Sequence, residues 1–195
     1  MKIAILKERR ANETRVAGSP ETIKKFVALG VDVCVEKGAG TTASMSDAAF
    51  REAGATIADD VASALDLADL VLKVQRPMIE GEKLNELANF KRGQVLVCQM
   101  SALSEPPFVA ALAASGVTGF ALELMPRIAR AQSMDILSSQ SNLAGYKSVL
   151  DAAAEFGRAF PMMMTAAGTI PPARVLVMGV GVAGLQAIAT AKRLG

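Results

Sequence analysis

The sequence contains no histidine and no tryptophan, and its only two cysteines, Cys34 and Cys98, lie far apart inside apolar stretches. Without histidine, and without cysteines at metal-ligand spacing, we expect no metal site. We interpret the two cysteines as reduced, buried thiols of a cytoplasmic protein. The lack of histidine also removes the side chain that most often serves as a general acid or base.

An excess of either charge and a long apolar run are missing as well. Twenty-one Lys and Arg residues against nineteen Asp and Glu residues leave a formal charge of +2, which excludes the basic footprint of a nucleic-acid-binding protein. Charged residues 7–10 follow the short apolar start at once, so the apolar core of a signal peptide is absent and we expect no export. The uncharged stretch 175–191 holds three glycines and Gln186, which favours a strand, a loop and a helix over a membrane span.

What is present is the composition of a globular protein, with 51% hydrophobic and 21% charged residues in 195. Short apolar runs alternate with helical segments, which is typical of βα units around a mostly parallel sheet. The runs that we expect to be strands are 2–6, 31–35, 70–74, 94–99 and 117–122. The segments that we expect to be helices are 20–29, 47–53, 81–88 and 106–114.

The pattern changes beyond Glu123, and this change indicates more than one domain. Residues 125–136 fit neither period and are expected to form a loop, after which Ser141 can cap a long helix. We therefore predict an N-terminal α/β domain over 1–137, a linking helix and linker over 138–172, and the start of a second domain over 173–195. The predicted fold class is α/β, with two Rossmann-like domains that have parallel sheets, the second cut off after its first βα unit.

The segment 173–195 carries a glycine motif in a suitable context. An apolar run over 174–178, expected to be a buried strand, leads into Gly179-Val180-Gly181-Val182 and Gly184, and a helix is expected over 185–194. In this motif the first glycine allows the tight turn, the second lets a pyrophosphate approach the backbone, and the third lets the helix pack closely. The free N–H groups at the helix start would bind the phosphates. A glycine-rich packing turn without a ligand is the alternative.

A second candidate site is the polar loop before the long helix, and it carries a family resemblance. Residues 130–149, RAQSMDILSSQSNLAGYKSV, resemble the signature of the alpha subunit of NAD(P) transhydrogenase. The opening 1–26, MKIAILKERRANETRVAGSPETIKKF, is similar to the start shared by that subunit and alanine dehydrogenases. The stretch GVGVAGLQAIATAKRLG completes the match, so the resemblance extends over essentially the whole chain.

The resemblance implies roles for four residues of the polar loop. Arg127, Gln132 and Asp135 would line the nicotinamide site of an NAD(H) domain, with Ser138 close by. Arg127 and Asp135 would pair and hold the carboxamide, while Gln132 would extend toward the ribose of the second nucleotide. A guanidinium fork held by a carboxylate is suited to fixing such an orientation. Judged by residue types alone, the same loop would be a solvated polar segment.

The resemblance also implies the activity and the partners. Hydride would pass between NAD(H) on this chain and NADP(H) on a separate subunit or domain, and a membrane-spanning component would couple that step to proton translocation. We expect a homodimer without a membrane span of its own, cytoplasmic and held at the inner membrane through its partners.

Two other functions stay open from the sequence. Oxidation of an amino acid moves a proton as well as a hydride, and where alanine dehydrogenases have a histidine after the fourth strand this chain has LVCQMS. Arg15 and Lys73 match positions that bind the substrate carboxylate in those enzymes, and we interpret them here as structural residues, with a vestigial anion site as the alternative. An alanine dehydrogenase-like enzyme and a non-catalytic NAD(H)-binding module therefore remain alternatives to a transhydrogenase.

Overall fold

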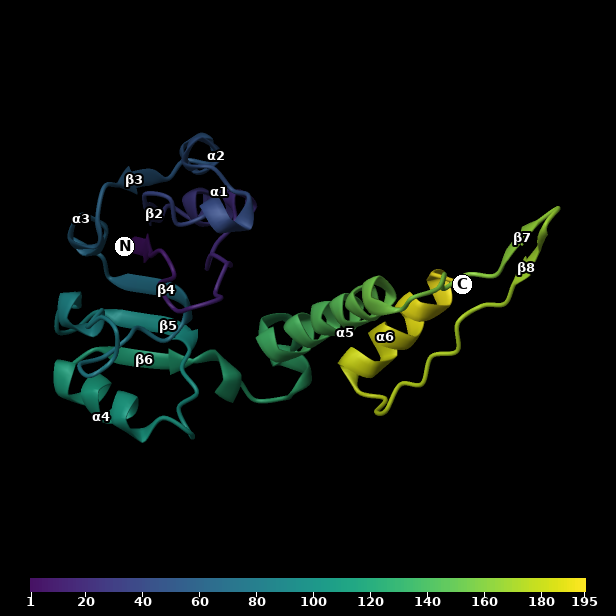
Figure 1. The fold of residues 1–195 in the computed structure, drawn as a ribbon. Coiled ribbons are helices and arrows are strands. Elements are labelled where there is room, and N and C mark those ends of the chain that lie inside the picture. Colours follow the sequence, from purple (N-terminus) through teal and green to yellow (C-terminus); the bar gives the residue numbers. More distant parts are fainter. The chain divides into compact units, whose positions relative to one another are not determined.

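The computed structural model describes residues 1–195, and these form two compact units, Met1–Met125 and Pro126–Gly195 (Figure 1). The first unit contains all strands of the large sheet, and the second contains two helices and a hairpin. The finer division that we predicted, with boundaries after residues 137 and 172, stays a prediction.

The first unit is built on a six-stranded sheet in which every neighbouring pair is parallel, in the order β3-β2-β1-β4-β5-β6. The strands are β1 Lys2–Ile5, β2 Asp32–Glu36, β3 Thr56–Ala58, β4 Leu70–Gln75, β5 Val95–Gln99 and β6 Thr118–Ala121. The α/β class and the five expected strands are confirmed, and β3 is an addition. The strand order reverses between β1 and β4, which is where parallel sheets of this kind leave a crevice at their carboxyl ends.

Four α-helices and short 3₁₀ turns connect these strands. The helices are α1 Pro20–Ala28, α2 Asp47–Glu52, α3 Val61–Leu65 and α4 Pro106–Ser115, and the turns are η1 Thr41–Ala43, η2 Leu87–Asn89 and η3 Leu122–Leu124. Helix α1 begins where the sequence predicts, because the Ser19 hydroxyl accepts a 3.2 Å hydrogen bond from the amide of Thr22 and Pro20 fits the first helical position.

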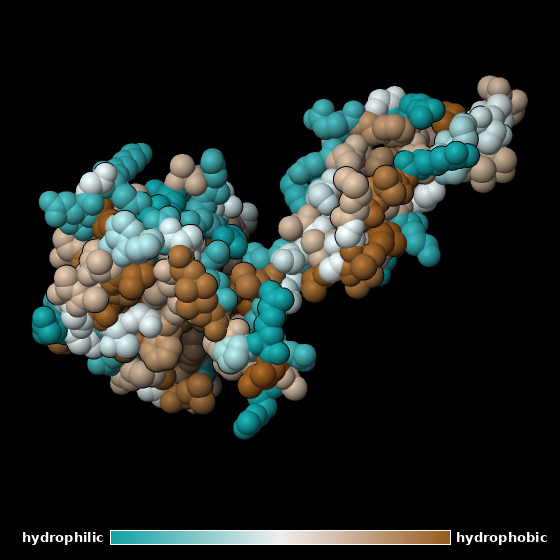
Figure 2. All heavy atoms as spheres, turned by 90° about the horizontal axis from the view of Figure 1, so that it is seen from below, coloured by the Kyte–Doolittle hydropathy of each residue, from teal (hydrophilic) through white to brown (hydrophobic).

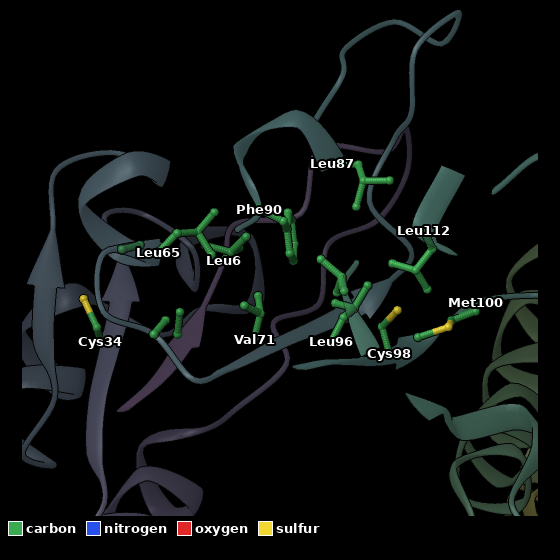
Figure 3. Packing of buried hydrophobic residues seen from close by; sticks show 14 of the residues in the cluster. Leu6, Cys34, Leu65, Val71, Leu87, Phe90, Leu96, Cys98, Met100 and Leu112 are labelled. Carbon is green, nitrogen blue, oxygen red and sulfur yellow. The ribbon is translucent and has the colours of Figure 1, made fainter. Parts of the chain in front are cut away.

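The core of the first unit lies on the two faces of the sheet. One face buries Leu6, Val71, Leu96, Cys98 and Phe90 together with helices α3 and α4, as Figure 3 shows from close by. Both cysteines are buried and free, and burial raises the pKa of the Cys98 thiol far above its ordinary value. This agrees with the expectation that the thiols are core residues.

The helix expected over 81–88 is not formed. This segment is a loop that ends in η2, and its two glutamates bind other parts of the chain. Glu82 accepts hydrogen bonds from Arg10 at 3.0 Å and from Arg76 at 2.8 Å, and Glu86 accepts one from the amide of Met78 at 2.9 Å. These charged contacts hold the backbone in a loop and override the weak helical pattern.

The second unit consists of α5 Ile136–Glu155, a hairpin of β7 Met163–Thr165 and β8 Gly168–Ile170, and α6 Val182–Arg193, with a 3₁₀ turn, η4 Ala129–Met134, before α5. Helix α5 begins at Asp135 rather than at Ser141, because Asp135 is its N-cap. The hairpin lies in the segment that we expected to be a linker.

The strand expected over 174–178 is not formed, because no other strand lies beside it to complete its hydrogen bonds. Leu176 and Met178 are consequently 87% and 92% exposed. The second unit therefore presents hydrophobic residues at its surface (Figure 2). None of the helices combines the length and the apolar character that crossing a membrane would require.

Candidate functional site

The glycine turn before α6 has the geometry that the motif requires. Gly179 has a φ of +108°, a conformation that side chains disfavour. A Cβ placed on Gly184 would lie 2.8 Å from the carbonyl carbon of Gly179 and closer still to its oxygen, so only glycine lets the helix start pack on the turn. These two glycines are explained by the fold itself.

Gly181 differs from both, because no contact within the protein demands a glycine there. It is the N-cap of α6, with a φ of −73°, and a Cβ added to it would meet no atom within 4 Å. No side chain caps the first turn of α6, so its N–H groups face open space beside Gly181. Val180 and Val182 are exposed on either side. This geometry suits an anion that approaches the backbone, such as the pyrophosphate of a dinucleotide.

Asp135 occupies the entrance of α5 and is held by one neighbour. Its Oδ1 accepts a hydrogen bond from the Ser138 amide at 3.0 Å, and its Oδ2 accepts one from the Ser138 hydroxyl at 2.6 Å. These hydrogen bonds, from the hydroxyl first and then the amide, lower the pKa of Asp135. The carboxylate is therefore charged and fixed in direction at the start of a helix.

The expected pair of Arg127 and Asp135 is not formed as an ion pair. Both carboxylate oxygens of Asp135 are engaged by Ser138, and the charge of Arg127 contributes only the smallest of the effects that lower the pKa of Asp135. Arg127 and Gln132 are exposed, and the carbonyl of Gln132 accepts a hydrogen bond from the amide of Asp135 at 3.3 Å. The loop thus brings Gln132, Asp135 and Ser138 together, and leaves the Arg127 side chain in solvent.

The sequence did not reveal a charged cluster at the carboxyl edge of the first unit's sheet. The ammonium of Lys73 is fully buried between Glu8 at 3.4 Å and Glu86 at 3.1 Å. Burial raises the pKa of Glu8, while the charge of Lys73 opposes that shift. The signal that could have indicated it is the charged stretch Lys7 to Arg10 directly after the central strand.

A second group of this cluster surrounds Arg15. Its guanidinium binds Glu13 at 2.7 Å, and the side-chain amide of Gln75 donates to the same carboxylate at 2.6 Å. The hydrogen bonds from Arg15 lower the pKa of Glu13 to about 2, against the opposing effect of burial. Arg15 and Lys73 thus have carboxylate partners within the chain, which agrees with a structural role for them.

The sequence profile of the N-terminal domain of alanine dehydrogenase/PNT proteins matches residues 4–144, and that of their C-terminal domain matches residues 148–195. The chain belongs to the alanine dehydrogenase/PNT family.

Among relatives in this family, the first of the separate chains that make up NAD(P) transhydrogenase subunit alpha of Rhodospirillum rubrum is 66% identical over all 195 residues, which cover 51% of that protein. A transhydrogenase structure from Sinorhizobium meliloti superposes with a TM-score of 0.93 at 51% identity, over the whole of this chain and 57% of that one. An L-alanine dehydrogenase structure superposes with a TM-score of 0.85 at 26% identity, over the whole of this chain and 53% of that one. The chain therefore spans about half the length of the relatives that it matches.

Proposed function

We propose that this chain is the NAD(H)-binding part of a proton-translocating transhydrogenase, in which hydride passes between NAD(H) held here and NADP(H) held by a partner subunit or domain. The observation that carries the proposal is the uncapped start of α6 at Gly181, where a glycine that the fold does not need keeps space open in front of free N–H groups.

The glycine turn binds the pyrophosphate in this proposal. The backbone of Gly179, Val180, Gly181 and Val182 faces the phosphates, and Gly184 lets α6 lie close enough for its first N–H groups to donate. The positive end of the helix dipole adds to the attraction for the negative phosphates.

The polar loop binds the nicotinamide end. Asp135 accepts a hydrogen bond from the carboxamide, and Ser138 keeps the carboxylate charged and in one orientation. Arg127 is exposed and carries a long side chain, so it closes over the carboxamide when the cofactor is present. Gln132 extends toward the ribose of the partner's nucleotide.

The two nicotinamide rings supply the chemistry, in which a hydride leaves C4 of the reduced ring and joins C4 of the oxidised ring. No proton has to be exchanged with the protein, and a chain without histidine suits such a reaction. The residues of the polar loop contribute by orienting one ring toward the other.

The same proposal includes the partners. The chain works with an NADP(H)-binding component and a membrane-spanning component, associates as a homodimer, and is held in the cytoplasm at the inner membrane through these partners. The name of its 66% identical relative, one portion of a divided subunit, supports an assembly of several components.

Hydride transfer in the intact subunit tests the proposal; by this we mean these residues together with the length that the relatives have beyond them. The subunit is mixed with the NADP(H)-binding component, NADPH and an NAD⁺ analogue whose reduced form absorbs at its own wavelength. We expect reduction of the analogue and no oxidation of L-alanine by NAD⁺. Alanine oxidation without transfer would make the chain an alanine dehydrogenase, and NADH binding without either reaction would make it a binding module.

A further inference from the structure

Helices α5 and α6 approach each other to backbone contact at one point in the second unit. A Cβ placed on Gly145, in the middle of α5, would lie 2.9 Å from the carbonyl carbon and 3.0 Å from the Cα of Ala183, and closer still to the Ala183 oxygen. The clash is with backbone of α6 and cannot be relieved by turning a side chain. Gly145 is buried, as is Val149 one turn further along α5.

The residue that Gly145 meets belongs to the first turn of α6. Ala183 is the second residue of this helix, and its neighbour Gly184 packs against the backbone of Gly179 in the same way. The first turn of α6 is thus held on one side by α5 and on the other by the glycine turn. A shift of α6 away from α5 would therefore carry the phosphate-binding turn with it.

Helix α5 also carries the polar loop, because Asp135 is its N-cap. Gly145 follows Asp135 by ten residues, which corresponds to about 15 Å along a helix axis. The loop and the contact with α6 thus lie on one straight helix at a fixed separation. A dinucleotide bound by both has to match that separation.

We propose that Gly145 is a positioning residue for hydride transfer, since its missing Cβ sets the spacing between the glycine turn at 179–184 and the polar loop at 127–138. The inference rests on the proposed function and deepens it. It assigns to a residue outside both binding segments the task of placing the nicotinamide ring once the phosphates are bound.

The test is Gly145→Ala in the intact subunit, with NADH affinity and hydride transfer measured separately. Alanine favours a helix more than glycine does, so any loss must come from the contact with Ala183. We expect kcat for transfer to fall about tenfold or more, because misplacement of reacting groups is costly, while the Kd for NADH changes less than about threefold. Gly157→Ala is the control, since a Cβ there meets no atom within 4 Å, and it is expected to leave both values unchanged.

A wild-type kcat in folded Gly145→Ala would overturn the proposal, and so would a parallel loss of kcat, NADH affinity and melting temperature, which marks a merely structural role. If Gly145→Ala does not fold, Ala187→Val replaces it, because Ala187 lies on the buried face of α6 one turn beyond Ala183. The same split at smaller size is expected, and an unchanged kcat overturns the proposal. Failure of the proposed function is distinct, since the wild-type subunit would then not transfer hydride at all.

Discussion

At the scale of single residues, the carboxylate of Asp135 combines a structural role with the proposed role in binding the carboxamide. Asparagine caps a helix about as well as aspartate, so Asp135→Asn separates the two roles. We expect hydride transfer in the intact subunit to fall about tenfold or more while the melting temperature stays near that of the wild type. Stopped-flow or steady-state transfer and calorimetry measure the two effects.

The chain offers a matched control for this variant. Asp60 caps α3 in the same way, with its Oδ1 accepting from the Ser63 amide at 2.7 Å and from the Ser63 hydroxyl at 2.6 Å. Asp60→Asn should reproduce the small change in melting temperature and leave transfer intact. Equal transfer in the two variants would remove Asp135 from the nicotinamide site.

Glu13 provides a prediction on pH and stability. Its pKa in the folded chain is about 2 and its ordinary value is 4.5, so the Arg15 contact stabilises the fold fully above pH 4.5 and this contribution is lost as the pH falls toward 2. We expect Glu13→Gln to be less stable than the wild type at pH 7, with a gap that narrows as the pH falls from 4.5. Urea unfolding at several pH values measures the gap.

An exposed ion pair serves as the control for Glu13. The carboxylate of Asp59 meets Lys37 at 3.1 Å with 86% of its side chain exposed, so Asp59→Asn is expected to change stability little at any pH. A gap for Glu13→Gln that is constant from pH 7 to pH 3 would mean that the Arg15 contact does not stabilise the fold.

At the scale of elements, the turn between Gly179 and Gly184 is the place where packing and ligand binding can be separated. Gly181→Val adds a side chain in space that is free of protein atoms, so the fold should persist while the approach of a pyrophosphate is blocked. We expect the Kd for NADH to rise about tenfold or more in calorimetric titration of the intact subunit. Gly157→Val is the control, and an unchanged affinity in Gly181→Val would identify the turn as a packing device alone.

The elements also show how far the sequence determines the structure. Local signals sufficed for the strands of the first sheet and for α1, where Ser19, Pro20 and Gly30 set both ends. They did not suffice for residues 81–88, since ion pairs with Arg10 and Arg76 come from distant segments. The apolar run at 174–178 is typical of a buried strand, but a strand forms only beside a partner, which no local pattern supplies.

The candidate site was predictable to a similar degree. Gly179 and Gly184 take the roles that their spacing indicates, whereas the roles of Arg127, Gln132 and Asp135 came from a resemblance and stay predictions. The contact of Asp135 with Ser138 follows the Asp-x-x-Ser spacing of a helix cap and could have been expected. The buried Lys73 could not, because lysine is almost never fully buried unless it is paired and the pairing is not visible in sequence.

At the scale of the whole molecule, the first unit has its own sheet and its own core, and it should fold alone. We expect a fragment of residues 1–125 to unfold in one cooperative transition and to bind no NADH, because the glycine turn and the polar loop both lie in the second unit. Circular dichroism during thermal unfolding and NADH fluorescence test both statements. A fragment without a cooperative transition would show that the first unit depends on the rest of the protein.

The central place of β1 in the sheet has a consequence for synthesis of the protein. The amide of Lys2 binds Asp69, 67 residues later, and Ile3 pairs with Leu70. The first strand to leave the ribosome must therefore wait for β4 before its second edge is covered. Until then a nascent chain presents an open, apolar strand, and such long-range parallel pairing is slow. Chaperones that bind nascent chains are thus expected to hold this protein during translation of its first third, and to release it as β4 emerges.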